Sequence, residues 1–153
     1  MNHYTIYWVK EEFARFFYYR SDVLYRFLKS YEQHQSREII ARQFHYITLD
    51  IPEDMLISNI MQSHPSHANL ITEGNSIKIY QEKRCISLHI EQKRINFRGN
   101  IIYDAEDLLF PALRSIHPYF FVVGAHPYDF GWIAPVTLER NMDKHEQVLY
   151  SHL

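Results

Sequence analysis

The sequence has little cysteine, little glycine and no large excess of one charge. Cys85 is its only cysteine, so no disulfide can form within the chain, and this favours an intracellular protein. Its four glycines leave little material for a loop that cradles phosphates. The P-loop, G-x-G-x-x-G, G-x-S-x-G and H-E-x-x-H motifs are all missing from the sequence. The common cofactor-binding and hydrolase signatures are thereby excluded.

Charge and hydropathy disfavour two further classes of partner, nucleic acid and membrane. The chain carries 16 basic and 18 acidic side chains, a formal charge of −2, which is not the basic footprint that binding to a phosphate backbone requires. No uninterrupted apolar run approaches the roughly 20 residues of a membrane span, and the first residues do not resemble a secretory leader. We therefore expect a cytoplasmic protein that contacts neither nucleic acid nor membrane directly.

The length of 153 residues is that of one ordinary domain, and 46% of the residues are hydrophobic. Strand-like and helix-like segments alternate along it, and some strand pairs are close enough to form hairpins. These features predict the α/β class: one domain over residues 1–140 with a mixed, mostly antiparallel sheet packed with helices. Residues 141–153 are expected to form a polar C-terminal tail.

Apolar periodicity predicts the order of the elements. Strands are expected at residues 3–9, 76–80, 85–90, 95–103 and 119–123, with extended segments at 44–51 and 130–133. Helices are expected at residues 10–19, 22–31, 53–62 and 104–116, the last kinked at Pro111. Residues 30–42 are polar and are expected to form a loop or a frayed helix.

Residues 13–19 contain five aromatic rings: Phe13, Phe16, Phe17, Tyr18 and Tyr19. At about 100° per residue, the three phenylalanines share one helix face, whereas the two tyrosines point away from it. Aromatic clusters at a surface commonly anchor protein interfaces. The alternative is that the phenylalanines pack into the core and the tyrosines lie along the surface.

Ten histidines raise the possibility of a small metal-dependent enzyme. His64 and His67 form the densest pair, and His126 with Asp129 forms a second. Neither pair has a specific metal-binding pattern, so this enzyme remains the alternative function. Cys85 lies in an apolar run that indicates packing rather than nucleophilic catalysis.

Basic residues are concentrated at Lys83-Arg84 and at Lys93-Arg94 with Arg98. On hairpin strands such charges commonly protect a sheet edge from aggregation, which is the interpretation we favour. A regulator that binds nucleic acid through this hairpin is a third alternative, which the near-neutral net charge disfavours.

Three separated blocks resemble the SirA family, the sporulation inhibitors of replication of endospore-forming bacteria. The blocks are residues 7–14 (YWVKEEFA), residues 43–48 (QFHYIT) and residues 130–136 (FGWIAPV), the last followed by Glu139-Arg140-Asn141. Their order and spacing agree with the family along almost the whole chain. Pro111 and the extended tail beyond Asn141 depart from the family pattern.

This resemblance implies a non-enzymatic inhibitor that binds the N-terminal domain of the replication initiator DnaA and needs no cofactor, metal or catalytic residue. Phe13 and Phe17 carry over as the anchors of that contact, and Tyr46 as a further contact. The family can have tyrosine at the Phe17 position, so this chain keeps the ring and loses the hydroxyl, which Tyr18 is expected to supply nearby. Glu11, Glu12 and Arg15 are expected to form the polar rim.

Overall fold

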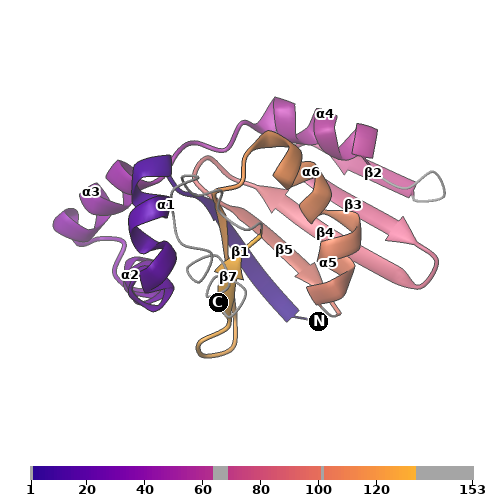
Figure 1. The fold of residues 1–153 in the computed structure, drawn as a ribbon. Coiled ribbons are helices and arrows are strands. Elements are labelled where there is room, and N and C mark those ends of the chain that lie inside the picture. The colour runs from indigo at the N-terminus through magenta and orange to yellow at the C-terminus, as the bar shows by residue number, and fades with distance from the viewer. Residues whose placement is uncertain (1, 64–68, 101, 134–153) are drawn as a thin grey trace, which may run out of the picture.

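The computed structural model describes residues 2–63, 69–100 and 102–133. Within these ranges the chain forms one seven-stranded sheet in the order β2-β3-β4-β5-β1-β6-β7 (Figure 1). Every pairing between neighbouring strands is antiparallel. The predicted α/β class and single domain are confirmed. The strands are β1 (Asn2–Trp8), β2 (Asn69–Glu73), β3 (Ser76–Gln81), β4 (Arg84–Ile90), β5 (Ile95–Gly99), β6 (Phe120–Gly124) and β7 (Phe130–Trp132).

β1 is an interior strand, as expected for a segment, residues 3–9, that is apolar on both of its alternating faces. It pairs with β5 on one side and with β6 on the other. Because side chains alternate along a strand, Tyr4 and Ile6 face one side of the sheet and Tyr7 faces the other. All three side chains are buried, so β1 is covered on both faces.

Helices cover the two faces of the sheet at different places. They are α1 (Glu11–Phe17), the 3₁₀ helix η1 (Tyr18–Arg20), α2 (Ser21–Gln33), α3 (Glu38–Ile47), α4 (Glu53–Ser63), α5 (Ile102–Leu108) and α6 (Phe110–Ile116). One hydrophobic core joins α4, α5 and α6 to the inward residues of β3, β4 and β5. A second core joins α1, α2 and α3 to β1 and β6, at the end of the sheet away from β2, β3 and β4 (Figure 1).

The prediction for residues 30–51 is wrong. Residues 30–42 were expected as a loop or frayed helix and residues 44–51 as an extended segment, whereas α2 continues to Gln33 and residues 38–47 form α3. Phe44 and Ile47 are the buried residues of α3, one turn apart, and the ring of Phe44 stacks on Tyr31 of α2 at 3.7 Å between centroids. The extended structure is reduced to a single bridge between Val9 and Thr48.

Three further boundaries differ from the prediction. β2 was not predicted, and β5 ends at Gly99 rather than at residue 103. The expected helix over residues 104–116 is divided into α5 and α6, with the break at Leu109 and Pro111 in the first turn of α6. Proline is tolerated there because the first amide groups of a helix have no intrahelical acceptor.

Lys83 and Lys93-Arg94 lie in hairpin turns, Arg84 begins β4 and Arg98 lies in β5. Both strands are interior and the edge strands are β2 and β7, so the edge interpretation is wrong. Lys93 forms an ion pair with Asp50 at 2.9 Å, and Arg94 forms one with Glu91 at 2.7 Å. The predicted polar tail over residues 141–153 lies outside the described residues. None of the helices in the described ranges is long and apolar enough to cross a membrane.

Candidate protein-binding site

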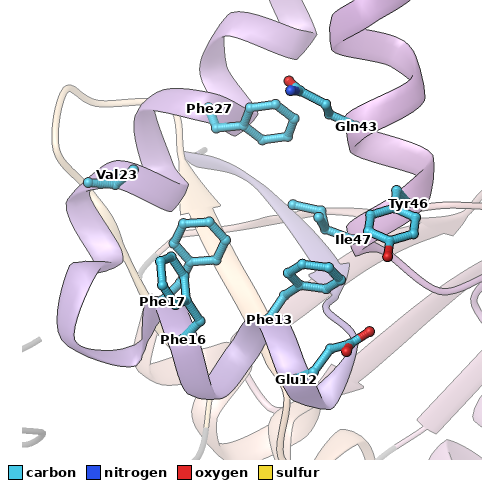
Figure 2. Close-up of a pocket in the computed structure, with 9 residues that line it drawn as sticks. All are labelled: Glu12, Phe13, Phe16, Phe17, Val23, Phe27, Gln43, Tyr46 and Ile47. Atoms are coloured by element: carbon cyan, nitrogen blue, oxygen red, sulfur yellow. The ribbon is translucent and has the colours of Figure 1, made fainter.

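An apolar groove of about 550 Å³ opens between α1, α2 and α3. We call it the aromatic groove. Figure 2 shows that its walls come from three helices that meet at one end of the sheet. It is lined by Glu12, Phe13, Phe16, Phe17, Val23, Phe27, Gln43, Tyr46 and Ile47.

α1 forms one wall because its phenylalanines repeat at helical spacing. Phe13, Phe16 and Phe17 stand at i, i+3 and i+4, and all three line the groove. Phe13 and Phe17 are half-buried against the second core, whereas Phe16 is 57% exposed. The rings of Phe16 and Phe17 meet edge to face, 5.0 Å apart between centroids. Phe13 and Phe17 thus form a base fixed by packing, and Phe16 forms the exposed rim of this wall.

α2 and α3 form the opposite walls. Val23 and Phe27 are one turn apart on α2, and Tyr46 projects from α3 toward α1 (Figure 2). The ring of Tyr46 is T-shaped against Phe13 at 5.3 Å between centroids, and the Lys10 ammonium lies 4.9 Å from the Tyr46 ring centroid. These contacts hold Tyr46 beside Phe13 although the side chain of Tyr46 remains 63% exposed.

Charged side chains lie beside the groove on α1. Glu11 and Glu12 occupy its first turn, where carboxylates interact favourably with the helix dipole. Arg15 forms an ion pair with Glu11 at 2.9 Å, and this hydrogen bond raises the pKa of Arg15. The Tyr119 hydroxyl donates to Glu11 at 3.3 Å, and burial, with the Glu11 charge as a smaller cause, raises the pKa of Tyr119. Tyr119 therefore stays a neutral hydrogen-bond donor.

Four of the six residues predicted for the partner surface line the aromatic groove: Glu12, Phe13, Phe17 and Tyr46. Arg15 does not line it but lies beside it, paired with Glu11. Tyr46 reaches Phe13 from a helix, not from the extended segment that the sequence predicted.

The structure buries Tyr18, which the family resemblance suggested as a hydroxyl near Phe17 on the partner surface. Its side chain is 2% exposed and its ring stacks on Trp132 at 5.9 Å between centroids. The chain tightens from α1 into the 3₁₀ helix η1 after Phe17, and this turns Tyr18 toward the sheet. The Tyr18 ring belongs to the second core, so it cannot act as a surface contact.

Sequence reasoning did not assign the other five lining residues to the site: Phe16, Val23, Phe27, Gln43 and Ile47. The helical spacing that links Phe16 to Phe13 was visible in the sequence. Val23 and Phe27 lie in the helix expected at residues 22–31, where their apolar spacing indicates core packing, and the position of Gln43 and Ile47 depends on α3, which was not predicted. The groove can therefore be identified only from the tertiary arrangement of α1, α2 and α3.

The residues of the alternative enzyme do not form a comparable site. His64 and His67 lie outside the described residues. In the turn between β6 and β7, the Asp129 amide donates to the His126 carbonyl at 3.2 Å. Within residues 2–63, 69–100 and 102–133, no three histidine, cysteine, aspartate or glutamate side chains gather as metal ligands would.

Comparison with known proteins gives one concordant result. The family model described as "Sporulation inhibitor of replication protein SirA" matches residues 2–137. A relative with the same description from Bacillus subtilis (strain 168) is 27% identical over 147 residues, which cover 91% of this chain and 97% of the relative. That description names an inhibitor of replication and no catalytic activity. Because the family model spans nearly the whole chain, the protein belongs to the SirA family of sporulation inhibitors of replication.

Proposed function

We propose that this protein inhibits the initiation of DNA replication during sporulation by binding the N-terminal domain of the initiator DnaA through the aromatic groove. The observation that carries this proposal is the pair of exposed rings at its rim: Phe16 is 57% and Tyr46 is 63% exposed. They flank half-buried Phe13 and Phe17, so apolar surface is contiguous across the groove. Continuous exposed apolar surface commonly marks a protein interface.

The energies of ring burial are sufficient for a specific complex. Burying a phenylalanine ring contributes roughly 1.5–3 kcal/mol before the costs of association. Two or three rings that become enclosed by a partner can therefore dominate an interface of about 800 Å² per partner. Glu12 and the Arg15–Glu11 pair supply charged groups around this apolar centre.

The mechanism we propose is occlusion. The protein covers a surface of the DnaA N-terminal domain that other replication proteins need, so the initiation complex does not assemble at the origin. No catalytic step, cofactor or direct contact with DNA is required. DnaA acts in the cytoplasm, and the proposal requires this protein to be present in the same compartment.

The test is calorimetric titration of the full chain into the isolated N-terminal domain of the cognate DnaA. Saturable binding near 1:1 is expected, with loss of binding in a Phe13→Ala variant whose circular dichroism spectrum matches the wild type. If the wild type does not bind, DnaA is not the partner. If the folded Phe13→Ala variant binds as the wild type does, the groove is not the contact surface.

A further inference from the structure

The second face of β3, β4 and β5 is not covered by a helix in the described part of the chain. Residues of the second core come from β1, β6, β7 and the N-terminal helices, and none comes from β2 to β5. α1, α2 and α3 gather at the opposite end of the sheet (Figure 1). A polar groove of about 650 Å³ lies on this uncovered face, separate from the aromatic groove. Its volume falls within the range of sites for small organic ligands.

Cationic side chains form a row across this face. Strand register places Lys78 of β3 opposite Ser87 of β4, Ser87 opposite Arg98 of β5, and Arg98 opposite His3 of β1. Strand alternation directs these side chains away from the first core, and Lys78, Arg98 and His3 are exposed. Ser87, Arg98 and His3 line the polar groove, whereas Lys78 stands next to Ser87 outside the lining. Neighbouring strands are about 4.8 Å apart, so Lys78 and Arg98 flank Ser87 across roughly 10 Å.

The four residues of the row include no carboxylate, and the nearest on this face by register is Glu73 of β2, opposite Ser76. Most arginines and lysines of the described residues pair with carboxylates, as Arg84 does with Asp107, whereas neither Lys78 nor Arg98 makes such a pair within the described ranges. No carboxylate lines the polar groove. The Glu91 carboxylate accepts a hydrogen bond from Asn96, which lines the groove, but it is also paired with Arg94. Lys78 and Arg98 stand two strands apart on either side of Ser87, so an anion above Ser87 would interact favourably with both charges.

A second row supplies neutral hydrogen-bonding groups. Ser76 contacts His89 at 3.1 Å between Oγ and Nδ1, and Thr5 donates to Asn96 at 3.2 Å. These side chains line the same groove as Arg98 and His3. A ligand held by its phosphate at the cationic row would thus meet hydroxyl, imidazole and amide groups along the rest of its length.

We propose that this face is a binding site for a phosphorylated small molecule of nucleotide size, with the phosphate held between Lys78 and Arg98 above the Ser87 hydroxyl. Lysine and arginine on flexible stems can converge on one phosphate from this spacing, and arginine can donate two parallel hydrogen bonds to it. The phenyl and phenol rings that line the groove, Tyr4 and Phe97, are buried. They cannot stack on successive bases as the exposed aromatic side chains of proteins that bind single-stranded nucleic acid do. The site therefore favours a compact anion over a polynucleotide.

The test is a titration of the ¹⁵N-labelled full chain with pyrophosphate and, separately, with ATP at low ionic strength. Saturable shifts are expected at the amides of Lys78, Ser87, Arg98 and His3. The Lys78→Gln/Arg98→Gln variant should lose at least tenfold in affinity. The matched control Arg37→Gln/Lys83→Gln removes the same charge from two exposed cations outside the row, and it should stay within twofold of the wild type.

Three results would overturn the proposal. The first is that neither pyrophosphate nor ATP binds saturably. The second is that the two double variants lose affinity equally, and the third is that the amide shifts cluster away from the row. A ten-nucleotide single strand that binds when pyrophosphate and ATP do not would also contradict the ligand class. If the Lys78→Gln/Arg98→Gln variant is unfolded, the single change Arg98→Gln carries the same test, because the arginine occupies the centre of the row.

Discussion

The ring of Phe13 on α1 meets the ring of Tyr46 on α3 edge to face, with 5.3 Å between centroids. This contact joins the first and second sequence blocks that resemble the SirA family into one surface. Aromatic pairs in this geometry are favourable beyond the area they bury. The Phe13–Tyr46 contact therefore fixes the width of the aromatic groove between α1 and α3.

Tyr46→Ala is expected to weaken binding to the DnaA N-terminal domain by at least tenfold, because it removes an exposed ring and frees Phe13 from its partner. Ile39→Ala is the matched control. Ile39 is on the same helix and is 70% exposed, but it does not line the groove. Calorimetry on both variants distinguishes the groove from α3 as a whole; equal losses would mean that the contact surface lies elsewhere on α3.

Phe16→Ala is expected to reduce binding by about 30-fold, corresponding to about 2 kcal/mol for an enclosed aromatic anchor. The free energy of unfolding should change by about 0.5 kcal/mol or less, because Phe16 is 57% exposed in the free protein. Urea denaturation and calorimetry measure the two effects separately. As a control, Tyr128→Ala removes a 72% exposed ring outside the groove and should leave the affinity unchanged. Unaltered binding by folded Phe16→Ala would exclude Phe16 from the interface.

Tyr18→Ala is expected to reduce the free energy of unfolding by about 3–5 kcal/mol, the usual cost of deleting a buried aromatic ring. Tyr18 is 2% exposed and stacks on Trp132, so its ring supports the core. Its neighbour Tyr19 is 45% exposed, and Tyr19→Ala should cost about 1 kcal/mol or less. Chemical denaturation of both variants gives the comparison. A small loss for Tyr18→Ala, with weaker binding by the folded variant, would instead place this ring at the interface.

Tyr18 is buried and Tyr46 is exposed on a helix, and neither position could be predicted from the local sequence pattern alone. Helical spacing identified α1 and its phenylalanine face because that pattern depends on nearby residues alone. The burial of Tyr18 depends on η1 and on Trp132 of β7, which is distant in sequence. Tyr46 was assigned to the site by family resemblance but to the wrong secondary structure, because its β-branched and aromatic neighbours are also typical of strands.

The β3–β4–β5 meander was predicted well because its alternating apolar residues specify one buried face, and β1 because its residues are apolar on both faces. The same alternation hid the significance of Lys78 and Arg98. In the sequence they are merely the outward residues of two strands. Only the register, through Ser87, brings them into one row.

His117 is expected to make stability depend on pH. Burial lowers the pKa of His117 in the folded protein, and the nearby Glu11 charge only partly opposes this effect. The unfolded chain therefore binds this proton more readily, near pH 6.5. The corresponding stability is fully present above that pH and is lost as pH falls through the lower folded pKa.

The comparison is urea denaturation of the wild type and His117→Phe between pH 5 and pH 8. Phenylalanine keeps a ring beside Trp8 and Tyr119, which contact His117 at 5.6 and 4.5 Å between ring centroids. The advantage of the wild type over the variant should shrink as the pH falls below about 6.5. The other histidines are common to both proteins, so a difference that is constant with pH would contradict the role assigned to burial.

Val23→Asp tests whether α2 belongs to the interface. Val23 lines the aromatic groove, is 38% exposed and lies in the first turn of α2, where a carboxylate interacts favourably with the helix dipole. The variant should therefore fold normally but lose DnaA binding by at least tenfold, because a partner that fills the groove would have to desolvate the new charge. Ile39→Asp introduces the same charge into the first turn of α3 outside the groove. If both variants bind equally well by calorimetry, the contact is confined to α1 and α3; if only Val23→Asp loses binding, all three walls of the groove enclose the partner.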